Sequence, residues 1–498
     1  MHRTGLLLVV IAAVACEAAP LPHTAPPALP PPPAAAATPA PPPAPELARA
    51  AVAFEQSLVV NLAGEEVGTM TAVDRTDSAG GFVLERTADL TIRRGETVSR
   101  LVTRTAVKLD ADGAPRSYRF EKEDPGGALV VDAVVSADRK TLELTSKQNG
   151  AVVKNAIALP PGFTFAVALE HEVKGAPKDG LRVERPVVLE ELGAVVPMTT
   201  TVKKDGEDFV ITASFQGLTT EERIDAKGRT IVSRTPSVGL VAYPWGKVPA
   251  DLEAALKDGK KADLLAVSTW KTTPVPREAR RVVYRVRTPD AATFAVPEDN
   301  RQRVVARTAT HVDIEVTSAP STTKPLAGEA RARALMSTPY EAVSDPRIQR
   351  AAKDATKGAT SDDDKVRKLS AFVYEHVQKK GLDRGYAPAI ATLESRAGDC
   401  TEHSVLLSAL LRAVGLPTRI VDGVVVDNTS AGYHEWVEVD LGKGFVAVDP
   451  TFNAWPAGPQ RVKLAEGSTL PDEHLGLSLA AARLLKHGVI FEVLSVDQ

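Results

Sequence analysis

The sequence predicts a multidomain protein with an antiparallel, β-rich sheet or sandwich region towards the amino terminus, followed by a region that opens with helices. Its 498 residues exceed the roughly 250 to 300 at which a single hydrophobic core stops growing. Residues 51–325 contain short β-branched and aromatic runs separated by turn signals, and they form one or two modules. From about Gly328 the apolar residues recur with helical periodicity instead.

The β-rich region contains several clear strand candidates and two similar turns. The turns, Asp110–Gly113 and Asp225–Gly228, each end in the glycine that a tight turn favours. The clearest strand candidates are Phe54–Leu62, Gly81–Ile92, Val98–Leu109, Phe209–Phe215 and Val282–Val286.

A core-facing helix is expected from about Asp363 to Lys380. Ser361 can cap its start, acidic residues occupy its first turn, and apolar residues recur on one face. Gly381, directly after two lysines, is a typical stop signal.

Residues 1–16 have the pattern of an export signal, and their end resembles a bacterial lipobox. His2 and Arg3 give a weakly positive start, an apolar run follows, and small residues precede Cys16. The apolar run is too short to span a bilayer. We expect an exported protein of the periplasm or cell envelope, anchored to a membrane by a lipid on Cys16, with the outer membrane favoured over the inner. An ordinary cleaved signal without a lipid is the alternative.

Composition indicates a linker and argues against one class of partner. Residues 17–50 are mostly proline and alanine, which favour extended polyproline II, either as a stalk or as a disordered spacer. The 60 basic and 63 acidic residues are mixed along the chain. No basic block of the kind that binds phosphate backbones is present, so we expect no nucleic-acid partner.

The cysteine count limits the chemistry that this chain can perform. Only Cys16 and Cys400 occur, so Cys400 is the one free thiol once Cys16 is acylated or removed, and no internal disulfide can form. A Cys400–His403 pair and the Glu170–Glu172 segment, taken as part of a strand, are weak metal candidates. We therefore expect no metal and no cofactor.

Cys400 is predicted to lie at the start of a helix. Gly398-Asp399 precedes it, a stripe of leucines follows, and Gly415 and Pro417 close the pattern. Unsatisfied amides at a helix start and a nearby imidazolium lower the pKa of a thiol from its usual value of about 8.5. The position suits a nucleophile, although a cysteine buried for packing is the other interpretation.

A β-hairpin is predicted downstream of this helix. Its strands, His434–Asp440 and Phe445–Asp449, are joined by four residues. Direct pairing across this even loop places Asp449 opposite Trp436 and on the same sheet face as His434. Side chains at such a diagonal step lie roughly 7 to 8 Å apart, near enough for a carboxylate and an imidazole to meet.

Together these residues permit a Cys400–His434–Asp449 relay. His434 would take the proton of the Cys400 thiol and later give it to the leaving amine, while Asp449 fixes the tautomer of the imidazole. Each residue taken alone has an ordinary structural explanation. The ordered set of three indicates catalysis.

Four ordered motifs resemble the core of the transglutaminase-like superfamily. They are Gly398-Asp399-Cys400, Arg412-Ala413-Val414-Gly415-Leu416-Pro417, His434-Glu435-Trp436 and Asp449-Pro450-Thr451. The resemblance covers about Gly328 to Trp455 and implies an α/β (α+β), cysteine-protease-like domain in residues 328–498. Glu435 departs from the family, because a small residue is common there, and it can alter the cleft or its charge.

The resemblance implies an enzyme that transfers an acyl group from a protein or peptide carboxamide through a thioester at Cys400. A cysteine protease or amidase with the same three residues is the closest alternative, and a non-catalytic binding or scaffold module of the envelope is another. The backbone amide of Cys400 is the expected oxyanion donor, with Tyr374 and Gln378 as candidates for a second donor.

Overall fold

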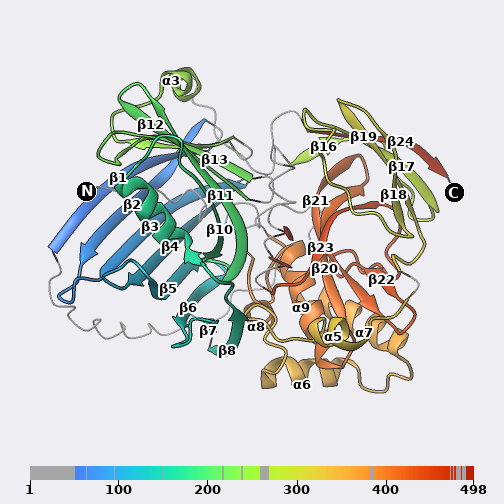
Figure 1. The fold of residues 1–498 in the computed structure, drawn as a ribbon. Helices are drawn as coiled ribbons and strands as arrows, with labels where there is room; N and C mark the ends of the chain where they lie inside the picture. Colours follow the sequence, from blue (N-terminus) through green and yellow to red (C-terminus); the bar gives the residue numbers. More distant parts are fainter. Residues whose placement is uncertain are drawn as a thin grey trace.

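The computed structural model describes residues 51–497, except for residues 63, 95, 149, 216–217, 237–238, 258–267, 323, 382–385, 471–472, 475, 478–483 and 485–488. The predicted export signal and the proline-alanine linker lie outside the described residues. Within the described part of the chain, no helix has the length and apolar character needed to span a lipid bilayer. The protein forms two lobes that lie side by side (Figure 1).

The amino-terminal lobe is built on one fifteen-stranded sheet with the order β8-β7-β6-β5-β4-β3-β2-β1-β15-β14-β13-β12-β11-β10-β9. Two runs of consecutive antiparallel strands meet where β1 pairs with β15, and the short β9 pairs in parallel with β10. The strands are β1 Ala51–Leu62, β2 Glu65–Thr76, β3 Phe82–Arg94, β4 Thr97–Leu109, β5 Pro115–Asp124, β6 Gly127–Val135, β7 Thr141–Gln148, β8 Ala151–Ala158, β9 Thr164–Phe165, β10 Arg182–Leu189, β11 Ala194–Asp205, β12 Asp208–Phe215, β13 Leu218–Ile224, β14 Thr230–Thr235 and β15 Leu240–Pro244.

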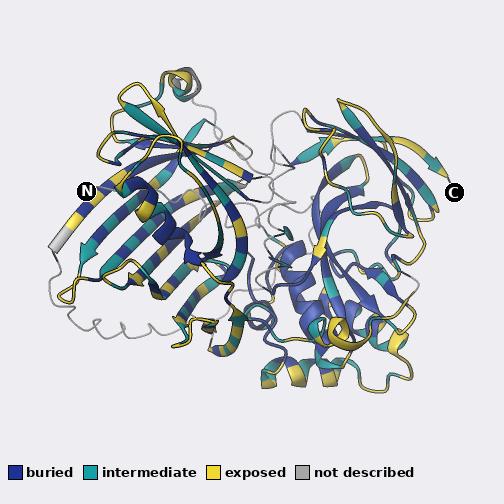
Figure 2. Cartoon of the chain, in the orientation of Figure 1, coloured by how far each residue is buried: buried dark blue, intermediate teal, exposed yellow. Residues whose placement is uncertain are grey.

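The predicted fold class is confirmed by this sheet and by the carboxy-terminal lobe. All five predicted strands are found, as β1, β3, β4, β12 and β17 (Arg281–Arg287). Both predicted turns are also found: the Gly113 amide donates to the Asp110 carbonyl and the Gly228 amide to the Asp225 carbonyl, each at 2.9 Å. Buried and exposed residues alternate along many strands of the lobe, as Figure 2 shows.

Helix α2 (Ala166–Gly175) lies across the large sheet and contacts both of its halves. His171 Nδ1 lies 2.8 Å from a carboxylate oxygen of Asp74 in β2, and Lys174 Nζ donates to Glu222 in β13 at 2.6 Å. The interpretation of Glu170–Glu172 as part of a strand was therefore wrong. Ala166, Val167, Leu169 and Val173 have helical spacing and are buried against the sheet, which outweighs the strand-like surroundings in the sequence.

The carboxy-terminal lobe contains two smaller sheets and a group of helices (Figure 1). One sheet has the order β16-β21-β20-β23, with β22 beside β21, and the other has the order β18-β19-β17-β24. Because β16 pairs with β21 and β24 pairs with β17, residues 269–317 fold together with the end of the chain. The bounds are β16 Thr269–Lys271, β18 Gln302–Arg307, β19 His311–Thr317, α5 Gly328–Arg333, α6 Pro346–Ala355, α7 Asp362–His376, α8 Ala389–Ser395, α9 Cys400–Ala413, β20 Thr418–Asp427, β21 Ser430–Asp440, β22 Phe445–Val448, β23 Arg461–Gly467 and β24 Ile490–Asp497; α3 (Ala250–Lys257) belongs to the other lobe.

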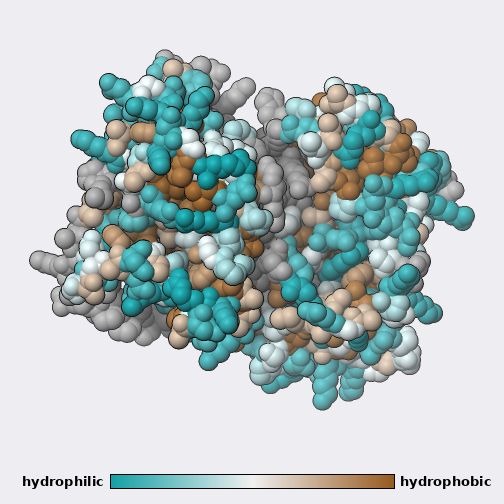
Figure 3. Space-filling view, viewed as in Figure 1, coloured by the Kyte–Doolittle hydropathy of each residue, from teal (hydrophilic) through white to brown (hydrophobic). Residues whose placement is uncertain are grey.

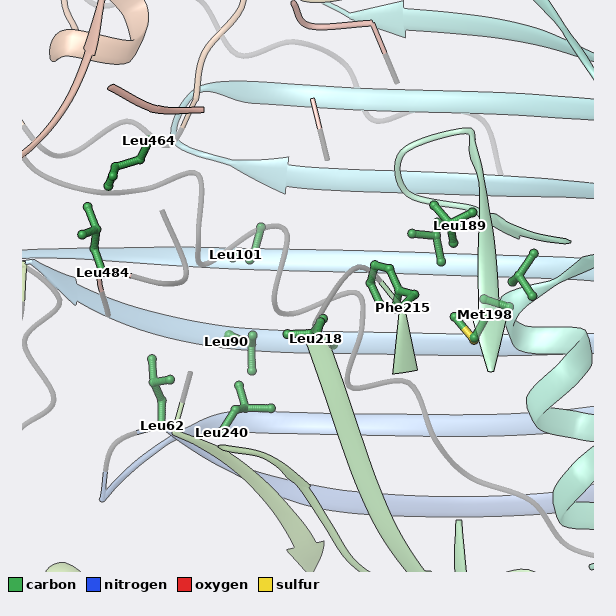
Figure 4. Packing of buried hydrophobic residues seen from close by; sticks show 14 of the residues in the cluster. Leu62, Leu90, Leu101, Leu189, Met198, Phe215, Leu218, Leu240, Leu464 and Leu484 are labelled. Atoms are coloured by element: carbon green, nitrogen blue, oxygen red, sulfur yellow. The ribbon is translucent and has the colours of Figure 1, made fainter. Parts of the chain in front are cut away.

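One hydrophobic cluster joins the two lobes. Leu464 of β23 and Leu484 belong to the same buried cluster as Leu62, Leu90 and Leu101 of the large sheet (Figure 4). Burial of the apolar side chains in this cluster stabilises contact between the lobes by about 25 cal/mol for each Å² removed from water.

The face of the molecule in Figure 3 is largely hydrophilic, with smaller hydrophobic areas.

Helix α7 ends earlier than the sequence predicts. The cap at Ser361 is confirmed, but the helix ends at His376 instead of Lys380. The Lys379 amide donates to the Arg396 carbonyl at 3.1 Å, in the segment that leads into α9. Because Lys379 pairs with this distant segment, the helix ends before Gly381, which was expected to end it.

A buried ion pair fixes the carboxy-terminal end of α9. Arg412 Nη1 donates to Glu341 Oε2 at 2.9 Å, and both side chains are fully buried. Hydroxyls of Thr338, Ser408 and Thr469 also donate to the Glu341 carboxylate. Arg412, the first residue of the second motif, therefore stabilises the end of α9 that lies away from Cys400.

We expect Glu341→Ala to lower the free energy of unfolding by about 3 to 5 kcal/mol, because it leaves the Arg412 guanidinium buried without a carboxylate. Urea unfolding followed by circular dichroism measures this change. Glu394→Ala is the control, since Glu394 pairs with Arg347 at the exposed surface and should cost less than about 1 kcal/mol. Equal losses in the two variants would contradict a structural role for the buried pair.

Candidate active site

Helix α9 begins at Cys400, as the sequence predicts, and a reciprocal capping box closes its start. Asp399 Oδ1 accepts a hydrogen bond from the Thr401 amide at 2.9 Å, and Glu402 Oε2 accepts one from the Asp399 amide at 2.8 Å. These bonds satisfy amides that a helix start leaves without partners. Nearly the whole helix is buried (Figure 2).

The β21–β22 hairpin has the predicted register. Asp440 pairs with Phe445 and Val437 with Val448, so Asp449 directly follows the end of β22. The Asp449 amide donates to the Ala454 carbonyl at 3.0 Å, which fixes the backbone beyond the strand. The carboxylate is thereby brought to the sheet face that carries His434.

His434 and Asp449 meet in the interior of the lobe. His434 Nε2 lies 2.7 Å from Asp449 Oδ2, and the two side chains are 1% and 0% exposed. Arg461 of β23 donates from Nε to the same carboxylate oxygen at 2.6 Å, while the Thr451 amide donates to Oδ1 at 3.0 Å. Both carboxylate oxygens of Asp449 therefore accept hydrogen bonds.

These contacts set the ionisation of Asp449. Burial by itself would raise the pKa of this carboxyl, but the charge of Arg461 and then that of His434 outweigh burial and hold the pKa well below its usual range. An ionised carboxylate can only accept hydrogen bonds, so the Nε2 atom of His434 carries the proton of the neutral ring. The other ring nitrogen, Nδ1, is left to act as a base.

The Cys400 thiol lies against β21. The Glu435 amide donates a hydrogen bond to the sulfur atom. Between the thiol and the His434 imidazole, both within the described part of the chain, the structure shows no hydrogen bond. The base role of His434 towards Cys400 therefore stays a prediction.

The expected lowering of the pKa of Cys400 is not found. Burial raises the pKa of this thiol well above its usual value, and the nearby carboxylates of Asp399, Glu435 and Glu402 add to the effect. The capping box places Asp399 and Glu402 at the positive end of α9, where burial and then the charge of Asp399 raise the pKa of Glu402 well above its usual value. In this arrangement Cys400 is a neutral thiol.

Among the described residues, the structure shows no hydrogen bond from Tyr374, Gln378 or His403 to the Cys400 thiol. Tyr374 and Gln378 are exposed, so their role as oxyanion donors stays a prediction. His403 Nδ1 donates to the Asp399 carbonyl at 2.5 Å, and burial lowers its pKa to about 4. No group of three or more metal-ligating side chains occurs among the residues that the structure describes.

Three features of this site were not predicted. The capping box could have been found, because Asp399 and Glu402 have its sequence spacing. Asp422 and Glu435 lie opposite each other in β20 and β21, and burial raises the pKa of Asp422 to about 7. The contact of Arg461 with Asp449 depends on the long-range pairing of β23 with β20, which has no local signal in the sequence.

Residues 349–450 match the family model described as the transglutaminase-like superfamily. A comparison with curated proteins finds no match. This match covers the start of α9, both strands of the hairpin and Asp449, but it ends before β23.

Distant likenesses to solved structures are also found. A candidate cysteine protease from Cytophaga hutchinsonii is 13% identical with a TM-score of 0.30, over 46% of this chain and 89% of that one. A β-barrel-like DUF1849 protein from Brucella abortus is 13% identical with a TM-score of 0.30, over 38% and 94%. The periplasmic domain of TgpA from Pseudomonas aeruginosa, bound to ethylmercury, is 18% identical with a TM-score of 0.27, over 38% and 77%.

We expect Asp449→Asn to lower the free energy of unfolding at pH 7 by about 3 kcal/mol or more, because Arg461 is left buried without its carboxylate. The folded-state pKa of Asp449 lies below the unfolded value of about 3.9, so its stabilising effect is complete above that value and declines as the pH falls. The difference between wild type and variant should therefore shrink by about 1 kcal/mol at pH 3. Urea unfolding at both pH values measures it, and an undiminished difference would contradict a depressed pKa.

Proposed function

We propose that this protein is a cysteine-dependent acyltransferase acting on a protein or peptide carboxamide, because residues 349–450 match the transglutaminase-like superfamily. Cys400 is the nucleophile, His434 the general base and acid, and Asp449 the residue that orients His434. The observation that carries the proposal is the buried 2.7 Å contact between His434 and Asp449, beside the helix start that bears the thiol.

The proposed reaction uses the charges at this site. As the neutral Cys400 sulfur attacks the carboxamide carbon, its proton passes to His434 Nδ1, and the ionised Asp449 stabilises the resulting imidazolium. His434 then gives this proton to the leaving amine, and the C–N bond breaks to leave a thioester on Cys400. An acceptor amine then attacks the thioester carbon, so that a new C–N bond forms and the C–S bond breaks. His434 Nδ1 takes a proton from the amine and returns it to the Cys400 sulfur, which restores the neutral thiol. The Cys400 amide is the proposed donor to the oxyanion.

Transfer to an amine is the proposed outcome, on the ground of the resemblance of residues 349–450 to the transglutaminase-like superfamily. Cys400, His434 and Asp449 are each at most 1% exposed, so a bound acyl donor and acceptor amine would have to shield the thioester from water for transfer to win over hydrolysis. A protease or amidase would use the same three residues and would differ in letting water reach the thioester. In a non-catalytic scaffold, by contrast, the three residues would have no reaction to perform.

The proposed location is the periplasm or cell envelope. The export pattern of residues 1–16 supports it, with Cys16 as the site of a lipid anchor and residues 17–50 as the linker. A protein or peptide of the same compartment is the proposed substrate.

Acylation by p-nitrophenyl acetate tests this function without knowledge of the natural substrate. We expect the wild-type chain to gain one acetyl group on Cys400, and His434→Ala to slow this step by about 100-fold or more, because general-base assistance is lost. Intact-mass and peptide mass spectrometry measure the product. Added cadaverine should shorten the lifetime of the thioester and yield acetyl-cadaverine.

The controls separate the three functions. Cys400→Ala should show no acetyl group at that position, and unfolded wild-type protein should react without dependence on His434. A thioester that decays at the same rate with and without cadaverine would favour the protease or amidase. A folded protein that is not acylated at Cys400, or is acylated equally without His434, would favour the scaffold.

A further inference from the structure

We propose that Arg461 is a positioning residue for the reaction, which holds Asp449 ionised and fixed against His434. The inference rests on the proposed function of Cys400, His434 and Asp449. Arg461 begins β23 and lies outside residues 349–450, so the match to the family model does not include it.

The contacts of Asp449 explain how Arg461 can act. The same oxygen, Oδ2, accepts hydrogen bonds from His434 Nε2 at 2.7 Å and from Arg461 Nε at 2.6 Å. A rotation of the carboxylate that broke one contact would also disturb the other. The Thr451 amide holds Oδ1 at 3.0 Å, so the carboxylate plane is fixed on both sides.

Phe452 contacts both donors of the carboxylate. Its ring meets the His434 imidazole edge to face, with centroids 5.3 Å apart. The Arg461 guanidinium lies 5.4 Å from the centroid of the same ring. The imidazole and the guanidinium are thus packed against one aromatic side chain as well as hydrogen-bonded to one oxygen.

The backbone that carries Arg461 is itself anchored. Arg461 pairs with Val425 where β23 joins β20. The buried Arg301 donates to the Ala457 carbonyl at 2.9 Å, to the Gly458 carbonyl at 2.5 Å and to the Arg461 carbonyl at 3.4 Å. Arg301 therefore fixes the backbone segment that positions Arg461.

The charge of Arg461 also decides whether Asp449 can stay ionised. The Asp449 side chain is fully buried and that of Arg461 is 5% exposed, so water replaces little of their interaction. Besides His434, the titratable groups that act on or are influenced by Asp449 are Lys380 and His403. Lys380 is exposed and donates to the Thr451 carbonyl at 3.5 Å, and burial lowers the pKa of His403 to about 4, so neither offers a direct substitute for Arg461.

The rate of iodoacetamide alkylation at Cys400, measured from about pH 4 to 9 on the full chain, tests this role. In Arg461→Gln we expect a new acid inflection and about tenfold slower labelling near pH 5, because the buried Asp449 takes up a proton and no longer fixes His434. Near pH 8 the loss should be smaller, about threefold or less. Arg419→Gln is the matched control, since Arg419 pairs with Glu438 in the same sheet, and it should keep the wild-type profile.

Arg461→Lys provides a second variant if the glutamine variant does not fold, as judged by circular dichroism. Lysine keeps the charge but lacks the planar guanidinium, so it should retain the wild-type acid limb and slow labelling by about two- to fivefold. A wild-type profile in the folded glutamine variant, or wild-type rates in the lysine variant, would overturn the role of Arg461. The proposed function is judged separately by His434→Ala. If this variant strongly slows alkylation of Cys400, the proposed function stands whatever the result for Arg461. If it does not, the proposed function fails as well.

Discussion

The burial of helix α9 is the constraint on which the carboxy-terminal lobe depends. The helix packs against α6, α7 and α8 on one side and against β20 and β21 on the other. In this position water cannot satisfy the backbone amides and carbonyls at the ends of the helix, so protein groups must do so. Asp399 and Glu402 therefore close its start, and the Arg412–Glu341 pair closes its end. The start that carries the proposed nucleophile is fixed by the same bonds that stabilise the helix.

This burial also shapes the proposed chemistry. It keeps Cys400 as a neutral thiol, because the low polarity and the nearby carboxylates oppose a thiolate. Asp449 is equally buried but stays ionised, because Arg461 supplies the opposite charge. The proposed site thus combines a neutral thiol on Cys400 with an ionised carboxylate on Asp449. Proton transfer to His434 during attack fits this arrangement better than a thiolate formed in advance.

Local rules were enough to predict the parts of the site that are close in sequence. The start of α9 followed from a cap and an apolar stripe, and the position of Asp449 followed from the length of the loop between β21 and β22. Long-range effects were beyond those rules. The early end of α7 depends on the pairing of Lys379, the contact of Arg461 depends on β23 meeting β20, and the raised pKa of Cys400 depends on burial.

For His434 to act as the base, its imidazole must carry a proton on Nε2, towards Asp449, and turn Nδ1 towards the Cys400 sulfur. Nitrogen-15 NMR of histidine-labelled protein measures this most directly, with the His434 signals identified by their absence in His434→Gln. We expect the Nε2–H tautomer near neutral pH, and a shift of the Nδ1 signal when Cys400 is capped with a methylthio group. The Nδ1–H tautomer, or an Nδ1 signal that does not respond to the capping of Cys400, would contradict the account.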